Sequence, residues 1–150
     1  NYLIMSENLS ILENSRDQDG NHFIIIKIPL PDLIEKKVVV RQKIDDSNST
    51  YDVTKDSFKE SESPEIGDTL IRIPAASYLN FLITNGLVII PKYTHVGSSI
   101  EKEQKVQKLF EKQFPDRKIV FIDVMPQNWF GGGIHCSAMQ QPALFSDTNR

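Results

Sequence analysis

Residues 78–90 are the segment that most constrains the fold of this chain. Two apolar runs, residues 78–84 and 87–90, are separated only by Asn85 and Gly86. An Asn-Gly pair between two such runs is the strongest short-range signal for a β-hairpin, because a type I′ turn needs positive φ at both central residues. The sequence therefore predicts an antiparallel hairpin over residues 78–90.

A helix and a further strand are predicted directly after this hairpin. Ser98 fits the N-cap of the helix, and Glu101, three residues later, completes a capping box. The buried face consists of apolar residues at helical spacing, namely Val106, Leu109, Phe110 and Phe114. Pro115 ends the helix, and residues 118–123 form the next strand. The predicted order is strand, strand, helix, strand.

The first 28 residues predict a helix followed by a strand. The apolar residues Tyr2, Met5, Leu9 and Leu12 recur at spacings of three and four, which indicates a helix with one buried stripe. Turn-forming residues at 17–21 end this helix. The β-branched run at residues 23–28 is almost continuously apolar, and this pattern predicts a strand that is buried on both faces.

Residues 41–68 differ in composition from the rest of the chain. They contain eight acidic and four basic residues, several turn-forming residues and few apolar ones. We expect a polar, mobile surface insertion here, and composition favours a solvated loop over a segment that binds a partner. An ordered apolar run resumes at residues 69–74.

The composition as a whole limits the class of protein. A chain of 150 residues with 39% apolar and 25% charged residues is typical of one soluble globular domain. The net charge of −3 and the scattered basic residues argue against nucleic-acid binding. No apolar run reaches the roughly 18 residues that suggest a membrane span. We therefore expect a cytoplasmic protein with no membrane or nucleic-acid partner.

The single cysteine excludes an internal disulfide. His22, His95 and His135 are far apart in the sequence, and paired ligands at helical spacing are absent from it. We therefore predict neither a metal site nor a cofactor.

Cys136 directly follows a glycine run and one histidine. Residues 129–136 read Trp-Phe-Gly-Gly-Gly-Ile-His-Cys. Three glycines let the backbone approach a ligand closely, and a thiol delivered there suits nucleophilic attack. Without further information, a small buried hydrophobe is the commoner role of a lone cysteine, so both interpretations stay open.

Three stretches of the sequence carry a family pattern. Residues 131–136 form a Gly-Gly-Gly-Ile-His-Cys motif, which Gln140-Gln141-Pro142 follows after three residues that depart from the pattern. Residues 114–123 match a strand entry, and residues 76–81 together with 85–91 match the preceding hairpin. These stretches resemble the agmatine deiminase and bacterial, Porphyromonas-type, peptidylarginine deiminase family.

The resemblance implies an α/β fold in which ββαβ units form a five-bladed α/β propeller, the pentein fold. Family members are much longer than this chain, so the resemblance implies a C-terminal part with about one and a half blades, too few to close a propeller. The remaining blades, or further copies of the chain, are the expected protein partners.

The activity that the resemblance implies is the hydrolysis of agmatine to N-carbamoylputrescine and ammonia, a route to putrescine. Cys136 would be the covalent nucleophile, and Gly132, Gly133 and Asn80 would contact the guanidine substrate. The family's catalytic His-x-Asp triplet does not occur in residues 1–150, so this chain alone is expected to be inactive. Peptidylarginine deimination and a non-catalytic binding or oligomerisation module remain alternatives.

Several further residues have both a functional and a structural interpretation. Asn80 either orients a site loop or makes a turn hydrogen bond. His135 would point away from the thiol if the segment were extended, which favours a packing or hydrogen-bonding role over a catalytic one. His95 fits a surface position, Trp129 fits the core or the wall of a cationic pocket, and Asp123 fits a strand-end cap or a site carboxylate.

Overall fold

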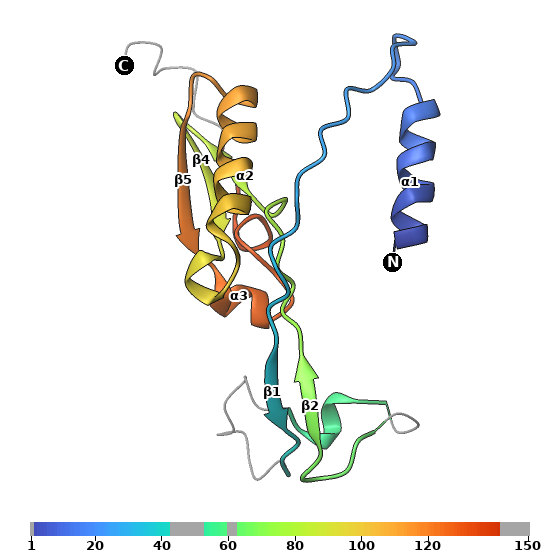
Figure 1. The fold of residues 1–150 in the computed structure, drawn as a ribbon, viewed down its shortest axis with the longest axis vertical. Coiled ribbons are helices and arrows are strands. Elements are labelled where there is room, and N and C mark those ends of the chain that lie inside the picture. Colours follow the sequence, from blue (N-terminus) through green and yellow to red (C-terminus); the bar gives the residue numbers. More distant parts are fainter. Residues whose placement is uncertain (1, 43–52, 60–62, 142–150) are drawn as a thin grey trace.

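The computed structural model describes residues 2–42, 53–59 and 63–141 (Figure 1). Its body is a three-stranded sheet in the order β3 (Leu82–Thr84), β4 (Leu87–Lys92) and β5 (Lys118–Asp123). β3 and β4 are antiparallel, whereas β4 and β5 are parallel and are connected through α2 (Ile100–Gln113). The predicted order of strand, strand, helix, strand is confirmed.

The hairpin between β3 and β4 is confirmed, with Leu82 opposite Ile89 and Thr84 opposite Leu87. Its first strand begins at Leu82 and not at residue 78. The predicted type I′ turn is wrong, because Gly86 has a φ of 71° but Asn85 does not have positive φ. One left-handed residue at the second central position is therefore sufficient for this connection.

The hydrophobic core lies between the sheet and α2. Val88 and Ile90 of the central strand are fully buried, as are Val106 and, almost entirely, Phe110 of α2. The core also contains two tyrosines, two residues after β5 and one from the N-terminal half, namely Tyr78, Tyr93, Val124, Met125 and Ile34. A central strand covered in this way needs a nearly continuous apolar sequence, which residues 87–91 supply.

The N-terminus of α2 is capped from a distant part of the chain, so the predicted capping box is wrong. The N-cap is Ser99, and its side chain makes no capping hydrogen bond. Instead, the carboxylate of Asp32 accepts a 2.8 Å hydrogen bond from the Ser99 N–H and pairs with Lys102. The Ser98 hydroxyl accepts a 3.0 Å hydrogen bond from the Asp32 N–H, which locks the two segments together.

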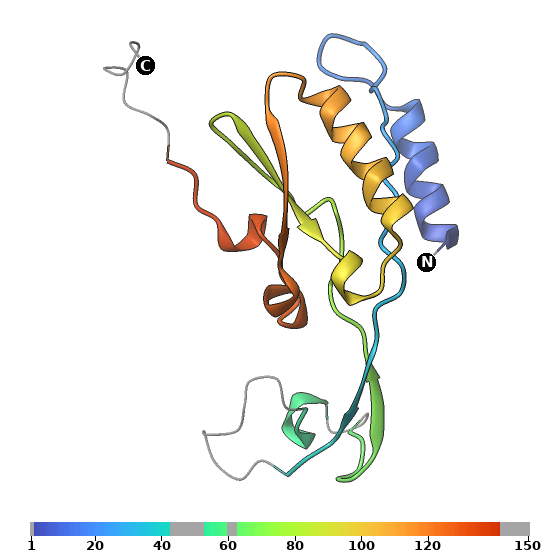
Figure 2. The same cartoon turned by 60° about the vertical axis from the view of Figure 1, so that its left-hand side comes forward.

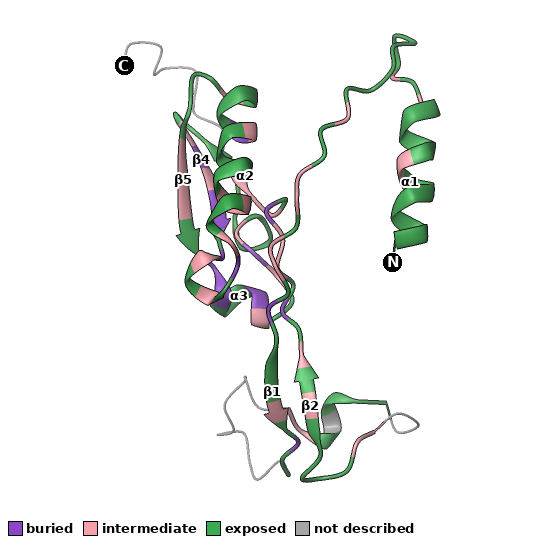
Figure 3. Ribbon diagram, in the orientation of Figure 1, coloured by how far each residue is buried: buried purple, intermediate pink, exposed green. Residues whose placement is uncertain are grey.

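The N-terminal helix forms as predicted, but its apolar stripe is not buried. α1 (Tyr2–Asn14) stands apart from the three-stranded sheet, and no residue of it is buried (Figures 1 and 3). Tyr2 is 83% exposed and Met5 is 65% exposed. Helical spacing shows that one face of a helix needs a cover but not which polypeptide supplies it, so the described residues leave this face open.

The predicted strand at residues 23–28 is wrong. This segment runs without a ladder partner among the described residues, and Ile24 is 90% exposed. A strand needs a neighbour for its backbone hydrogen bonds, and neither described sheet includes this segment. The structure thus contains one ββαβ unit, and the five-bladed propeller stays a prediction.

A second, two-stranded sheet extends away from the body (Figure 2). It pairs β1 (Lys36–Val39) with β2 (Thr69–Arg72) in antiparallel register. From the sequence we predicted an ordered apolar run that includes β2, and nothing at β1. The predicted insertion at residues 41–68 lies partly outside the described residues. Its described part includes a 3₁₀ turn, Lys55–Ser57, and an ion pair of 3.1 Å between Lys55 and Glu65.

Two further findings concern the described residues only. None of their helices combines the length and apolar character that crossing a membrane requires. Within the same ranges, histidine, cysteine and acidic side chains do not gather in any group that could hold a metal ion.

Candidate active site

Cys136 lies in a 3₁₀ turn, His135–Ser137, that comes after β5 and the short helix α3 (Met125–Trp129). Asp123 at the end of β5 starts α3, because its carboxylate accepts a 2.9 Å hydrogen bond from the Met125 N–H. The segment that carries the thiol thus leaves the sheet at the carboxyl end of β5, an edge at which α/β proteins commonly build their sites.

The glycine run after α3 folds back against the end of that helix. The buried side chain of Asn128 donates a 2.7 Å hydrogen bond to the carbonyl oxygen of Gly132. The Gly132 N–H donates in turn to the carbonyl oxygen of Gln127 at 3.1 Å. On the far side of the run, the Ser137 hydroxyl donates to the Gly133 carbonyl oxygen at 3.1 Å. These bonds fix the turn that carries Cys136.

Asn80 contacts this turn from the segment before β3. Its side-chain nitrogen donates a hydrogen bond to the sulfur of Cys136 at 3.2 Å, across 56 residues of sequence. Its side-chain oxygen accepts a 2.7 Å hydrogen bond from the His135 N–H. One amide thus holds both the thiol and the backbone of the turn.

The two glycines predicted to contact substrate occupy different surroundings. Gly133 is buried, and a Cβ built on it would lie 2.6 Å from Cγ of Asn80. A Cβ on Gly132 would make an ordinary contact, 3.7 Å from Cβ of Cys136. The structure therefore brings Gly133 together with Asn80 and Cys136, and the absence of a side chain at Gly133 makes room for the Asn80 amide.

The thiol of Cys136 is exposed, so the interpretation of this residue as a small buried hydrophobe is wrong. The hydrogen bond from Asn80 lowers the pKa of the thiol, and the backbone N–H of Gly133 lowers it further. Donors that face sulfur favour the thiolate over the thiol. Because the thiolate is the nucleophilic form, this site favours attack on an electrophilic carbon.

The residues that follow Asn80 and those that follow Cys136 line an open groove. It has a volume of about 550 Å³ and lies between the hairpin residues 82–85, which follow Asn80, and residues 138–141, which follow Cys136. Among the described residues, its lining combines apolar and amide side chains with one hydroxyl and includes no carboxylate. These described residues therefore offer a bound cation dipoles but no counter-charge.

The comparison with known proteins decides the family. Residues 1–142 match the Porphyromonas-type peptidyl-arginine deiminase family. The chain belongs to this family. The predicted relationship is thus confirmed over almost the whole sequence, including the exposed cysteine and the glycine run before it.

Relatives within the deiminase family include proteins named as agmatine deiminases. That of Pseudomonas syringae pv. tomato is 31% identical over 137 residues, which cover 91% of this chain and 32% of the relative. That of Pseudomonas aeruginosa is 31% identical over 143 residues, or 95% of this chain and 33% of the relative. The chain therefore spans about a third of the length of the curated relatives it matches.

A solved deiminase structure supports the α/β fold. The agmatine deiminase of Enterococcus faecalis matches this chain with a TM-score of 0.53 and 32% identity, covering 87% of this chain and 30% of that protein. The fold of the described ββαβ unit is thus that of a deiminase segment.

The remaining candidate residues of this deiminase family member have structural contacts. His135 lies in a 3₁₀ turn and not in an extended strand, so the predicted alternation of side chains does not apply to it. Nε2 of His95 lies 3.0 Å from Oδ1 of Asp123, which pairs two residues that the sequence analysis had considered separately. The guanidinium of Arg72 lies 5.7 Å from the ring centroid of Trp129, so the chain itself places a cation on this ring.

Two residues that support this candidate site were not predicted from the sequence. Asn128 bridges the glycine run and the segment before the hairpin, because its backbone oxygen accepts a 3.1 Å hydrogen bond from the Ala75 N–H. The hydroxyl of Tyr93 accepts a 2.9 Å hydrogen bond from the Ser77 N–H, three residues before Asn80. Asn128, as a polar residue within an apolar stretch close to the glycine run, carried a detectable signal, whereas Tyr93 resembled an ordinary core aromatic residue.

Proposed function

We propose that this chain is the cysteine-bearing part of an agmatine deiminase, which hydrolyses agmatine to N-carbamoylputrescine and ammonia. The observation that carries the proposal is the exposed Cys136 thiol with its lowered pKa, held by Asn80, in a chain of the deiminase family. The names of the two Pseudomonas relatives favour agmatine as the substrate.

In the proposed reaction, the thiolate of Cys136 attacks the central carbon of the guanidinium group. A carbon–sulfur bond forms and the π electrons move onto nitrogen, which gives a tetrahedral adduct. Ammonia leaves with the electrons of its carbon–nitrogen bond after it has received a proton. Water then attacks the amidino-cysteine carbon and gives up its protons, one of them to the base that the general acid became when it protonated ammonia and the other to solvent. The carbon–sulfur bond breaks with its electrons going to sulfur, and the ureido product leaves the regenerated thiolate.

In this proposal, different parts of the protein supply the nucleophile and the groups that protonate ammonia and orient the substrate. The described residues supply the nucleophile and the donors that stabilise its anionic form. Ammonia is a poor leaving group unless a general acid protonates it, and a planar cation needs carboxylates for orientation. We propose that residues outside this chain supply both groups, because its relatives are about three times as long.

We also propose that the remaining deiminase polypeptide covers the exposed apolar residues of the N-terminal segment. Leu3 and Leu30 are 81% and 66% exposed, and Ile24 is 90% exposed. Apolar side chains exposed along one continuous segment mark a surface that is buried in an assembly. A second copy of this chain is the alternative occupant, which the mass of the purified complete protein would reveal.

The test measures ammonia release from agmatine and from a blocked arginine peptide by the complete gene product that carries this chain. We expect release from agmatine, its loss in Cys136→Ala, and negligible turnover by the 150-residue chain alone. Gln104→Glu, a change at an exposed residue of α2 outside the segment proposed to be covered, is the control and should keep the activity. Release from the arginine peptide only would identify a peptidylarginine deiminase, and full activity in Cys136→Ala would exclude the cysteine mechanism.

A further inference from the structure

Asn80 is held in place from both sides along the chain. Before it, Ser77 is bonded to Tyr93, a fully buried residue whose pKa burial raises to about 12. After it, the ring of Phe81 packs edge to face on Phe110, with centroids 4.8 Å apart. Both Tyr93 and Phe110 belong to the hydrophobic core. The residues on both sides of Asn80 are thus attached to the hydrophobic core.

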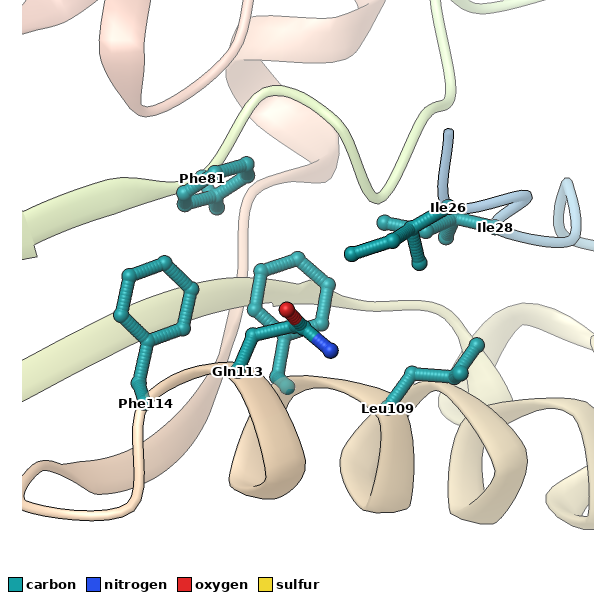
Figure 4. Close-up of a pocket in the computed structure, with 7 residues that line it drawn as sticks. Ile26, Ile28, Phe81, Leu109, Gln113 and Phe114 are labelled. Atoms are coloured by element: carbon teal, nitrogen blue, oxygen red, sulfur yellow. The ribbon is translucent and has the colours of Figure 1, made fainter. Parts of the chain in front are cut away.

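Phe81 also forms one wall of an apolar pocket between α2 and the extended N-terminal segment (Figure 4). This pocket has a volume of about 280 Å³ and is a different site from the groove beside Cys136. Phe114 lies beside Phe81 at the pocket, with the two ring centroids 6.2 Å apart. The aromatic contacts therefore fix the backbone that leads from Asn80 into β3.

The orientation of the Asn80 amide follows from its contacts. The backbone N–H of His135 can only donate a hydrogen bond, so the atom that faces it at 2.7 Å must be the amide oxygen. A reversed amide would set two donors against each other. The NH₂ group must therefore face the sulfur of Cys136, where it donates at 3.2 Å.

Gly133 makes a third contact with the Asn80 amide, besides those of His135 and Cys136. A Cβ on Gly133 would lie 2.6 Å, 2.8 Å and 2.9 Å from Cγ, Oδ1 and Nδ2 of Asn80. All three distances are shorter than real Cβ contacts, so the glycine backbone packs directly on the amide plane. The turn that carries Cys136 therefore packs against the same Asn80 amide that is hydrogen-bonded to it.

We propose that Asn80 is a positioning residue that holds the sulfur of Cys136 as a thiolate in the geometry for attack, and that it does not bind the substrate. The proposal rests on the proposed function, since it assigns a role within the deiminase reaction. In that reaction sulfur is an anion twice, before it attacks the guanidinium and when it leaves the amidino adduct. A fixed donor stabilises both of these states.

The test compares the thiol in three forms of the 150-residue chain. Because Cys136 is the only cysteine, the iodoacetamide alkylation rate, measured by intact mass as a function of pH, reports on this sulfur alone. Asn80→Asp keeps the oxygen that accepts from His135 but replaces the donor to sulfur by a second oxygen. Asn8→Asp introduces the same charge at an exposed position on α1 and serves as the matched control.

We expect the midpoint of the alkylation profile to shift to higher pH in Asn80→Asp, with a several-fold slower reaction at neutral pH, and to stay unchanged in Asn8→Asp. Because a carboxylate beside the sulfur also repels the thiolate, a fourth form, the neutral variant Asn80→Ala, separates the lost donor from the added charge. An unshifted midpoint in Asn80→Ala would overturn the proposal. If an Asn80 variant misfolds, a comparison within the unsubstituted chain still tests the proposal. The midpoint of the native chain must lie below that of the same chain unfolded in urea, and equal midpoints would also overturn it.

This assay contains no guanidine substrate, so its result is independent of the proposed function. A shifted midpoint together with no ammonia release from agmatine would reject the agmatine deiminase assignment and keep the contact between Asn80 and the thiolate. Ammonia release together with an unshifted midpoint would reject the role of Asn80 alone. In the active protein, we expect Asn80→Asp to lower kcat much more than it changes KM.

Discussion

Gly132 and Gly133 are neighbours for which the same substitution to alanine should have opposite effects. Neither has positive φ, so the backbone of each accepts an alanine. The difference lies in the space around them. The new Cβ at 132 would lie 3.7 Å from Cβ of Cys136, whereas the new Cβ at 133 would lie 2.6 Å from Cγ of Asn80. Carbon atoms normally approach to about 3.5–4.0 Å, so Gly133→Ala requires a displacement of about 1 Å.

The magnitude follows from what can move. Asn80 is anchored through Ser77 and Phe81, so it cannot withdraw without disturbing the core. Overpacking typically costs about 1–3 kcal/mol, and a hydrogen bond lost as the amide tilts costs about 1 kcal/mol more. We therefore expect Gly133→Ala to lower the free energy of unfolding by about 2–4 kcal/mol. Gly132→Ala should be neutral or stabilise by up to about 1 kcal/mol, because alanine restricts the unfolded chain.

Urea unfolding followed by the fluorescence of Trp129, the only tryptophan, measures both free energies. Alkylation of Cys136 on the same samples shows whether the strain reaches the thiol. We expect slower alkylation at neutral pH in Gly133→Ala and little change in Gly132→Ala. Equal stability of the two variants, with equal alkylation profiles, would refute the close contact between Gly133 and Asn80.

Two further predictions concern the supports of the site. Tyr93→Phe removes the hydroxyl that accepts the hydrogen bond from the Ser77 N–H, and it leaves this half-buried N–H without that partner. The free energy of unfolding should therefore fall by about 1–3 kcal/mol. An unchanged urea midpoint would contradict this prediction. The pKa of Asp32 is lowered from 3.8 to about 2, first by Lys102 and then by the Ser99 N–H. Its contribution to stability is therefore present above pH 3.8 and lost as the pH falls towards 2. Asp32→Asn should reduce the stability loss over this pH interval, and parallel pH profiles of the two proteins would show that Asp32 is not responsible.

Local patterns in the sequence were sufficient for the elements that contact their neighbours along the chain. The two apolar runs with the Asn-Gly pair at residues 82–92 and the helical spacing in α2 report on contacts a few residues apart. The sequence predicted only the order of these elements, and the structure adds that β4 and β5 are parallel, as a single crossover helix between two strands of one sheet requires.

Contacts between distant segments could not be predicted in this way. Asp32 caps α2 across 67 residues, and Asn80 reaches the Cys136 sulfur across 56 residues. The capping box failed for this reason, since Ser98 and Glu101 have the right spacing but Asp32 provides a charged acceptor for the same N-terminus. The exposed stripe of α1 reflects the same limit, because a pattern identifies an apolar face but not its partner.

The site joins two segments that the core holds independently. Asn80 is fixed through Tyr93, whereas the turn of Cys136 is fixed through α3 and Asn128. A hydrogen bond from the Ala75 N–H to the Asn128 oxygen links the two supports at 3.1 Å. The contact between Asn80 and the sulfur therefore closes a loop of bonds that includes the buried residues Tyr93 and Asn128. Because these two buried residues support the two halves of the site, the thiol can be presented at the surface while buried residues set its geometry.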